Sequence, residues 1–340
     1  MLHPKSAIAR ILPAGTLALA VALGASACTS AAPAQGSGSS ATAQAGSTSA
    51  STAKPGKVTF KDDLGREVTV NNPKRVVVGM GSLADIWRDA GGKVVAVSDD
   101  AFSNFGFDRD KVAGVGTHSN LNLESIMAQD PDFVILTAGS DANDRGPSQD
   151  KLRESLEGSG IPVAFFKVDT FDDYLRMLKT CTQITGRGDM YKKNGTDLKK
   201  RVDAAIKKYS VADAKPSVVV VTASSKGAGA QKPDHLASLM LKELGASLLT
   251  EENPSLLTQF SMESLAELDP DYIFVLPAAD SDEKANQNYK TAIEDNPAWA
   301  GIDAVKKGNV TVLDIEHFFR KPNNEWDQAY ETLGKALQNL

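Results

Sequence analysis

From Val58 onward, short continuous apolar runs alternate with segments whose apolar residues recur at helical spacing. The runs "RVVVGM" and "KVVAVS" predict buried strands, and "SLADIWRDAGG" between them predicts a helix that ends at Gly91 and Gly92. The runs "DFVILTA" and "IPVAFFKV" continue the series, with the helix "QDKLRESLEGSG" between them. Continuous apolar strands are typical of a parallel sheet covered on both faces. The pattern therefore predicts an N-terminal α/β lobe over residues 58–169.

A different pattern begins at Thr170. Apolar residues then mark helical faces, with brief interruptions at Gly186 and Gly195, and no strand signal occurs before Pro216. We therefore expect a helical connector over residues 170–210. From "PSVVVVTAS" a second α/β series begins, which predicts a C-terminal lobe over residues 211–340. The predicted fold class is α/β, with two Rossmann-like lobes that contain parallel sheets and are joined by a long helical connector.

One stretch of the chain is written twice. The segment "NLESIMAQDPDFVILTAGSD" recurs as "SMESLAELDPDYIFVLPAAD", displaced by 139 positions. The shared residues Glu124, Ser125, Asp130, Pro131, Asp132 and Asp141 recur as Glu263, Ser264, Asp269, Pro270, Asp271 and Asp280. Each copy predicts a short helix capped by Asn122 or Ser261, which Asp-Pro ends before a buried strand. Any two α/β halves can share such features, but the fixed offset favours real pseudo-symmetry between the lobes.

The N-terminus predicts export. Lys5 and Arg10 precede an apolar run that is too short for a comfortable membrane span but suits a secretory signal. Ala25 and Ala27 form an A-x-A site directly before Cys28, in a segment that resembles a lipobox. We expect residues 1–28 to be a lipoprotein signal peptide with lipidation at Cys28. Ordinary cleavage that leaves a free N-terminal Cys28 is the alternative, because Ala25 stands where Leu is more usual.

Residues 29–57 consist mainly of Ser, Ala, Gly and Thr, with almost no apolar bulk to support folding. We therefore expect a disordered tether that holds an extracytoplasmic domain near the cell membrane, at the cell surface or in the periplasm. The only other cysteine, Cys181, lies among apolar residues at helical spacing. It has no disulfide partner within the mature domain, so a buried, inert thiol is expected.

Composition and motifs limit the possible functions. The chain is 41% hydrophobic, has a net charge of −6 and has no basic cluster, which disfavours nucleic acid as a partner. It contains no G-x-S-x-G, no H-E-x-x-H and no P-loop, so we expect no enzyme activity and no covalently bound cofactor. Its four histidines are a poor ligand set for a protein that binds bare metal ions. An exported enzyme and an adhesion or scaffold protein remain as alternatives of other classes.

Several stretches together resemble the helical-backbone (class III) substrate-binding proteins of ABC importers, a family that captures iron-siderophores, haem and cobalamin. They are "DDLGREVTVNNPKRVVV", "VGTHSNLNLESIMAQDPDFVI", "SMESLAELDPDYIFV", "NPAWAGIDAVKKGNVTVLD" and "KPNNEWDQAYETL". The resemblance implies a monomer that captures an iron chelate, foremost a ferric siderophore, between its lobes and delivers it to a permease dimer. It also implies that one glutamate on each lobe docks the permease, at Glu124 and Glu263.

Ligand contacts are expected in loops at the carboxyl ends of the strands, because ligands of open α/β sheets approach there. The cationic candidates to clamp an anionic chelate are Arg145, Lys226, Arg320 and Lys321. Phe318 and Phe319 are candidates to cover an aromatic or apolar part of the ligand. Met80 and His118 lie in loops of the kind that supply axial ligands to haem, so haem remains an alternative ligand, as does cobalamin.

Overall fold

The structure, a computed structural model, describes residues 56–138, 142–279 and 281–340, without the side chains of residues 142–148. Cys28, the signal segment and all but the last two residues of the expected tether lie outside the described residues, as do Asp141 and Asp280. Both sheets described below belong to one compact unit of the chain. Within the described residues no helix is both long enough and apolar enough to cross a membrane.

The N-terminal lobe begins with an antiparallel hairpin, β1 (Lys57–Lys61) and β2 (Glu67–Asn71). Its main sheet has five parallel strands in the order β5-β4-β3-β8-β9. These strands are β3 (Val76–Val78), β4 (Ala96–Val97), β5 (Ala113–Gly114), β8 (Phe133–Thr137) and β9 (Val163–Phe166). The helices are α1 (Gly81–Asp89), α2 (Asp100–Asn104), α3 (Leu123–Met127) and α4 (Ala142–Gly158). A small hairpin, β6 (Gly116–Thr117) and β7 (Asn120–Leu121), precedes α3.

Helices follow in place of strands, as predicted for the connector. They are α5 (Phe171–Thr185), α6 (Gly188–Tyr191), a π-helical turn (Lys192–Asp197) and α7 (Leu198–Tyr209). A capping box at Thr170 begins α5, and Gly186, at φ 70°, ends it in the left-handed conformation that glycine adopts without a Cβ clash. Cys181 is fully buried in α5, and burial raises the pKa of its thiol, which fits the inert residue expected.

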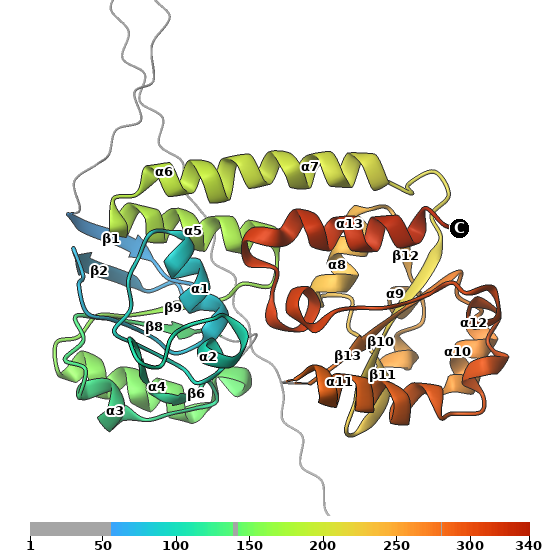
Figure 1. The fold of residues 1–340 in the computed structure, drawn as a ribbon, viewed down its shortest axis with the longest axis horizontal. Coiled ribbons are helices and arrows are strands. Elements are labelled where there is room, and N and C mark those ends of the chain that lie inside the picture. The colour runs from blue at the N-terminus through green and yellow to red at the C-terminus, as the bar shows by residue number, and fades with distance from the viewer. Residues whose placement is uncertain (1–55, 139–141, 280) are drawn as a thin grey trace, which may run out of the picture. The chain divides into compact units, whose positions relative to one another are not determined.

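The C-terminal lobe is built on β10 (Ser217–Ser224), which pairs in parallel with β12 (Ser247–Leu248) and β13 (Tyr272–Pro277). The remaining strands are the antiparallel β11 (Gly227–Ala230) and the parallel β14 (Val310–Val312). The helices are α8 (Leu236–Glu243), α9 (Leu249–Glu252), α10 (Met262–Leu268), α11 (Asp282–Tyr289), α12 (Asp303–Lys307) and α13 (Trp326–Leu337). Short helical turns lie at Pro254–Leu257, Lys290–Glu294, Trp299–Gly301, Glu316–Arg320 and Asn323–Glu325. The fold class predicted from the sequence is confirmed (Figure 1).

The repeated stretch has the same geometry in both lobes. Asp130 and Asp269 adopt matching left-handed conformations, with φ of 47° and 44°. The Asp132 carboxylate accepts backbone hydrogen bonds from Lys74 and Arg75 at 2.7 and 2.8 Å, and the Asp271 carboxylate accepts one from Ser217 at 2.8 Å. Each aspartate thereby holds the start of the strand, β3 or β10, that pairs with its own. The sequence repeat is therefore a repeat of structure.

Candidate functional site

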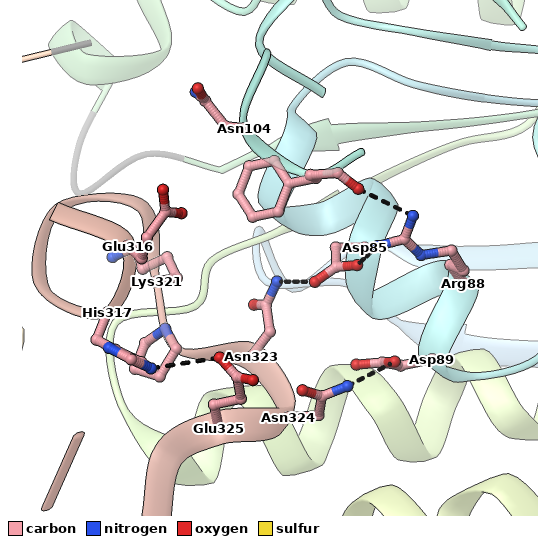
Figure 2. A pocket seen from close by; sticks show the side chains of 12 residues that line it. Asp85, Arg88, Asp89, Asn104, Glu316, His317, Lys321, Asn323, Asn324 and Glu325 are labelled. Atoms are coloured by element: carbon pink, nitrogen blue, oxygen red, sulfur yellow. Dashed lines mark hydrogen bonds and ion pairs between the residues drawn. The ribbon is translucent and has the colours of Figure 1, made fainter. Parts of the chain in front are cut away.

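A cavity of about 480 Å³ lies between the two lobes (Figure 2). On the N-terminal side it is bounded by α1 and by the loop after α2. On the C-terminal side it is bounded by Glu316–Glu325, which follows β14 and which we call the interlobe segment. The lining residues are Asp85, Arg88, Asp89, Asn104, Phe105, Glu316, His317, Lys321, Pro322, Asn323, Asn324 and Glu325.

Two asparagines attach the interlobe segment to α1. The side-chain amide of Asn323, which is only 3% exposed, donates to the Asp85 carboxylate at 2.6 Å and to the carbonyl oxygen of Ser82 at 3.3 Å. The amide of Asn324 donates to the Asp89 carboxylate at 3.1 Å. Figure 2 shows both amides directed at α1. These contacts join the two lobes at the wall of the cavity. Because both acceptors are carboxylates, the hydrogen bonds are stronger than bonds between neutral groups.

Behind the cavity, α13 continues the attachment. Trp326 is 1% exposed, and its ring centroid lies 5.6 Å from that of Phe171, the first residue of α5. Farther along, α13 packs against α7 (Figure 1), and the Tyr330 hydroxyl donates to the Glu243 carboxylate at the end of α8. The C-terminal part of the chain therefore contacts both lobes and the helices that connect them.

Asp89 has an unusual environment for a carboxylate. Its pKa is raised to about 7, first by burial and then by the neighbouring negative charge of Asp85. The hydrogen bond from Asn324 and the positive charge of Arg88 oppose this shift only in part. Arg88 itself forms an ion pair with Asp85 and donates to the backbone of Phe105 at 2.9 Å. Burial and the charge of Asp85 therefore favour the neutral form of the Asp89 carboxyl group.

His317 lies between the carboxylates of Asp314, which precedes the interlobe segment, and of Glu325, which ends it. Its Nδ1 is 2.8 Å from the Asp314 carboxylate, and its Nε2 is 3.3 Å from the Glu325 carboxylate. The hydrogen bond with Asp314 raises the pKa of His317, although burial acts in the opposite direction. The imidazole therefore links Asp314 to the last residue of the interlobe segment, and these two carboxylates match its charge.

A second cavity, of about 600 Å³, lies between the loop at the start of α5 and the segment before α8. The Lys321 ammonium lines both cavities and forms a 3.1 Å ion pair with Asp169, which also pairs with Lys167 at 2.8 Å. Burial lowers the pKa of His235 to about 4. The imidazole of His235 is therefore neutral at pH 7, consistent with the hydrogen bond that its Nδ1 accepts from the backbone of Ala237 at 3.2 Å.

The ligand candidates from the sequence are distributed unevenly around these cavities. Lys321 lines both, and Arg320 forms an ion pair with Glu316, which lines the first. Phe319 is 46% exposed in the same segment. Phe318, in contrast, is 2% exposed and belongs to the core, because the π-helical turn directs it inward. It is therefore not at the cavity surface in this structure.

The remaining candidates do not line either cavity. Met80 precedes α1 and packs against the core, and the exposed His118 occupies the turn between β6 and β7. Lys226 is exposed in the turn between β10 and β11. The backbone of Arg145 belongs to α4, and its side chain lies outside the described residues. Within the described part of the chain, no cluster of three or more histidine, cysteine or acidic residues suits a metal ion.

Sequence reasoning missed the residues that join the lobes. Asp85 and Asp89 are spaced i and i+4, which puts both carboxylates on one face of α1. The stretch "KPNNEWDQ" carries the family resemblance and the ligand candidate Lys321, but its local pattern assigns no role to its two asparagines, which form the attachment. The acidic face of α1 was a visible signal, but its partner is more than two hundred residues away in sequence.

Glu124 and Glu263 occupy equivalent, exposed positions in the first turns of α3 and α10. Asn122 and Ser261 cap these helices by accepting from the backbone of Ser125 at 2.8 Å and of Ser264 at 3.0 Å. Among the described residues neither glutamate has an ion-pair partner. Both carboxylates are therefore accessible on the surface, one on each lobe.

Two lobes that share one repeated unit, with a cavity between them, are typical of proteins that bind a small molecule between their lobes. Comparison with known proteins indicates the same class. Residues 76–316 match the family described as "Periplasmic binding protein", so the chain belongs to that family. The family consists of substrate-binding transport proteins and not of enzymes, which sets aside the enzyme alternative. The family resemblance inferred from the sequence is confirmed.

Three similar proteins come from Bacillus subtilis. YhfQ, provisionally named an ABC transporter substrate-binding lipoprotein, is 26% identical over 77% of this chain and 82% of its own length. YfmC, an Fe(3+)-citrate-binding protein, is 25% identical over 79% of this chain and 82% of its own. The crystal structure of the petrobactin-binding protein YclQ has 22% identity and a TM-score of 0.64, covering 83% of this chain and 99% of that one. The last likeness shows a shared fold.

Proposed function

We propose that this chain is the extracytoplasmic binding lipoprotein of an ABC importer, which captures an iron chelate, foremost a ferric siderophore, and delivers it to a permease dimer. The observation that carries the proposal is the cavity between two pseudo-symmetric lobes in a member of a substrate-binding family. The names of the relatives support the ligand class, since one binds ferric citrate and another binds petrobactin. The volume of the cavity between the lobes lies within the range usual for small-molecule sites.

Haem and cobalamin find no specific support among the described residues. Met80 and His118, which suggested haem, occupy a core-packed position before α1 and an exposed turn, and neither lines the two cavities. The ferric siderophore therefore remains the ligand that we propose.

The docking role that we propose belongs to Glu124 and Glu263. Their support is equivalence: the same residue type occupies the same exposed first turn of the repeated helix in both lobes. Exposed ion pairs add little affinity individually, but two such contacts at a fixed separation set orientation on a two-subunit partner. We further propose that the N-terminal lobe begins at residue 58, the helical connector at residue 170 and the C-terminal lobe at residue 211. The chain acts as a monomer in this proposal.

The membrane anchor that we propose is an acyl group on Cys28. The proposal rests on the A-x-A site and the tether, and on the lipoprotein name of one relative. Replacing Cys28 with Ser should move the protein from the membrane fraction to the soluble fraction, with ligand affinity unchanged. Retention of Cys28→Ser protein in membranes at the wild-type level would contradict the anchor.

Ligand titration of the purified protein tests the proposed function. Ferric chelates should quench tryptophan fluorescence saturably and transfer their charge-transfer absorption to the protein, because Trp87 is buried in α1 and Trp326 is buried directly after the interlobe segment. The iron-free chelators are the matched controls and should bind more weakly. Saturable binding of haem with a Soret band, and of no ferric chelate, would replace the siderophore proposal. Binding of neither class would remove the transport proposal itself.

A further inference from the structure

The cavity between the lobes contains hydrogen-bond acceptors that have no donor. Among the described residues, Oδ2 of Asp89 and Oδ1 of Asn323 are buried without a hydrogen-bond partner, and both residues line the cavity. The orientation of the Asn323 amide is fixed, because its nitrogen already serves two acceptors, Asp85 and the Ser82 carbonyl. Its oxygen is therefore the atom left over, on a side chain that is 97% removed from solvent.

The cations of the lining are already occupied. Arg88 forms an ion pair with Asp85, Lys321 with Asp169, and His317 with Asp314. The lining carries four carboxylates in all, Asp85, Asp89, Glu316 and Glu325. An anionic ligand would have to displace one of these carboxylates from its cation and would leave a buried charge uncompensated, which is strongly unfavourable.

We propose that the chelate bound in this cavity presents a positively charged, hydrogen-bond-donating nitrogen, such as a primary ammonium, to Asp89 and Asn323. The inference rests on the proposed function and defines its substrate class more narrowly. An ammonium group supplies three donors and no acceptor, so it matches two open acceptors of the lining, Asp89 Oδ2 and Asn323 Oδ1. A polyanionic chelate, such as a ferric tris-catecholate, matches neither the charge nor the hydrogen-bonding pattern. The sequence-based expectation of a cationic clamp for an anionic chelate is thereby replaced.

The charge of Asp89 changes with such a ligand. A carboxyl group whose burial raises its pKa to about 7 is only partly ionised at neutral pH. A ligand cation nearby favours the ionised form, so binding of an ammonium chelate should release protons at pH 7. The N-acetylated chelate, which has no charge at that nitrogen, should not do so.

Three ferric chelates of different charge test the proposal on the full-length, processed protein. The first is a linear ferric trihydroxamate with a terminal ammonium, the second is the same chelate after N-acetylation, and the third is a ferric tris-catecholate. Fluorescence titration should give about tenfold tighter binding of the ammonium form than of the acetylated form, and still weaker binding of the tris-catecholate. The first two share their iron coordination, so their difference isolates the charged nitrogen.

Asp89→Asn keeps the shape of the side chain and its contact with Asn324 while it removes the carboxylate. It should reduce the preference for the ammonium form to about threefold or less. Asp213→Asn makes the same change in net charge at an exposed loop residue outside both cavities, and should leave the preference unchanged. Equal affinity for the first two chelates, or tighter binding of the tris-catecholate, would overturn this inference while the proposed function stands. If no ferric chelate binds, both fail.

Discussion

The two lobes repeat one unit and differ in the segments added to it. The same elements follow one another from Glu124 to the end of β8 and from Glu263 to the end of β13. They are a short helix, an aspartate in the left-handed conformation and a buried strand. In the N-terminal lobe an antiparallel hairpin precedes the sheet, whereas in the C-terminal lobe β11 folds back on β10. The C-terminal lobe alone supplies the interlobe segment.

The helices that end in acidic residues show how the repeat is used. In the N-terminal lobe α1 ends at Asp89, and in the C-terminal lobe α8 ends at Glu243; a glycine with positive φ follows two residues after each. The C-terminal part of the chain binds both carboxylates, through Asn324 and through Tyr330. The repeated aspartates thus hold equivalent strands in both lobes, whereas the interlobe segment and α13, which have no copy in the N-terminal lobe, join the lobes and bound the cavity.

The largest effect on transport is expected at Glu124 and Glu263, the equivalent glutamates that we propose dock the permease. Changing both Glu124 and Glu263 to Arg should reduce whole-cell uptake more than tenfold, because it reverses the charge that each glutamate brings to its proposed ion pair with the permease, while chelate affinity stays nearly unchanged. The matched control is Glu67→Arg with Glu294→Arg, which makes the same charge change at exposed positions of both lobes outside α3 and α10. Normal uptake by a folded Glu124→Arg, Glu263→Arg protein would remove the docking role.

A second test concerns the unduplicated attachment of α13. Trp326→Ala should lower the free energy of unfolding by about 3–5 kcal/mol, because it leaves a cavity where the indole now packs against Phe171. Urea denaturation followed by circular dichroism measures the loss, and Trp326→Phe, which keeps an aromatic ring there, should lose clearly less. A loss below about 1 kcal/mol for Trp326→Ala would mean that the packing of α13 against α5 contributes little to the stability of the fold.

The end of α1 predicts a dependence of stability on pH. The pKa of Asp89 is raised from 3.8 to about 7, so the folded protein retains a proton that the unfolded chain releases between these values. The contribution is fully present below about pH 4 and is lost as the pH rises to about 7. Asp89→Asn should remove this decline and raise stability at pH 8 by about 1–3 kcal/mol. Parallel stability-against-pH curves for wild type and variant would contradict the assignment.

The smallest effects compare the repeated aspartates directly. Asp132→Ala and Asp271→Ala should each cost about 1 kcal/mol, since each removes the carboxylate that accepts from the backbone at the start of β3 or β10. Chemical denaturation of both variants measures the two losses under one condition. If one variant is destabilised by several kcal/mol and the other by nothing, the two copies are alike in sequence but not in structural role.

The sequence by itself determined the fold class, the repeat and the family. Apolar runs and helical spacing are local properties, and a fixed offset between copies can be read without coordinates, so the strands around Val76 and Val218 and the caps at Asn122 and Ser261 were predictable. Cys181 was recognisable as a buried thiol for the same reason, since its neighbours at helical spacing are apolar.

The tertiary structure alone decided which polar residues meet. Asp85 and Asn323 are 238 positions apart, and no local pattern pairs a helix carboxylate with an amide at that separation. The sequence offers Lys321 and Arg320 as cations for an anionic ligand, whereas in the fold Lys321 pairs with Asp169 and Arg320 pairs with Glu316. Charge in a sequence counts groups, whereas the charge that a ligand meets depends on which groups are already neutralised by neighbours, and that depends on the fold.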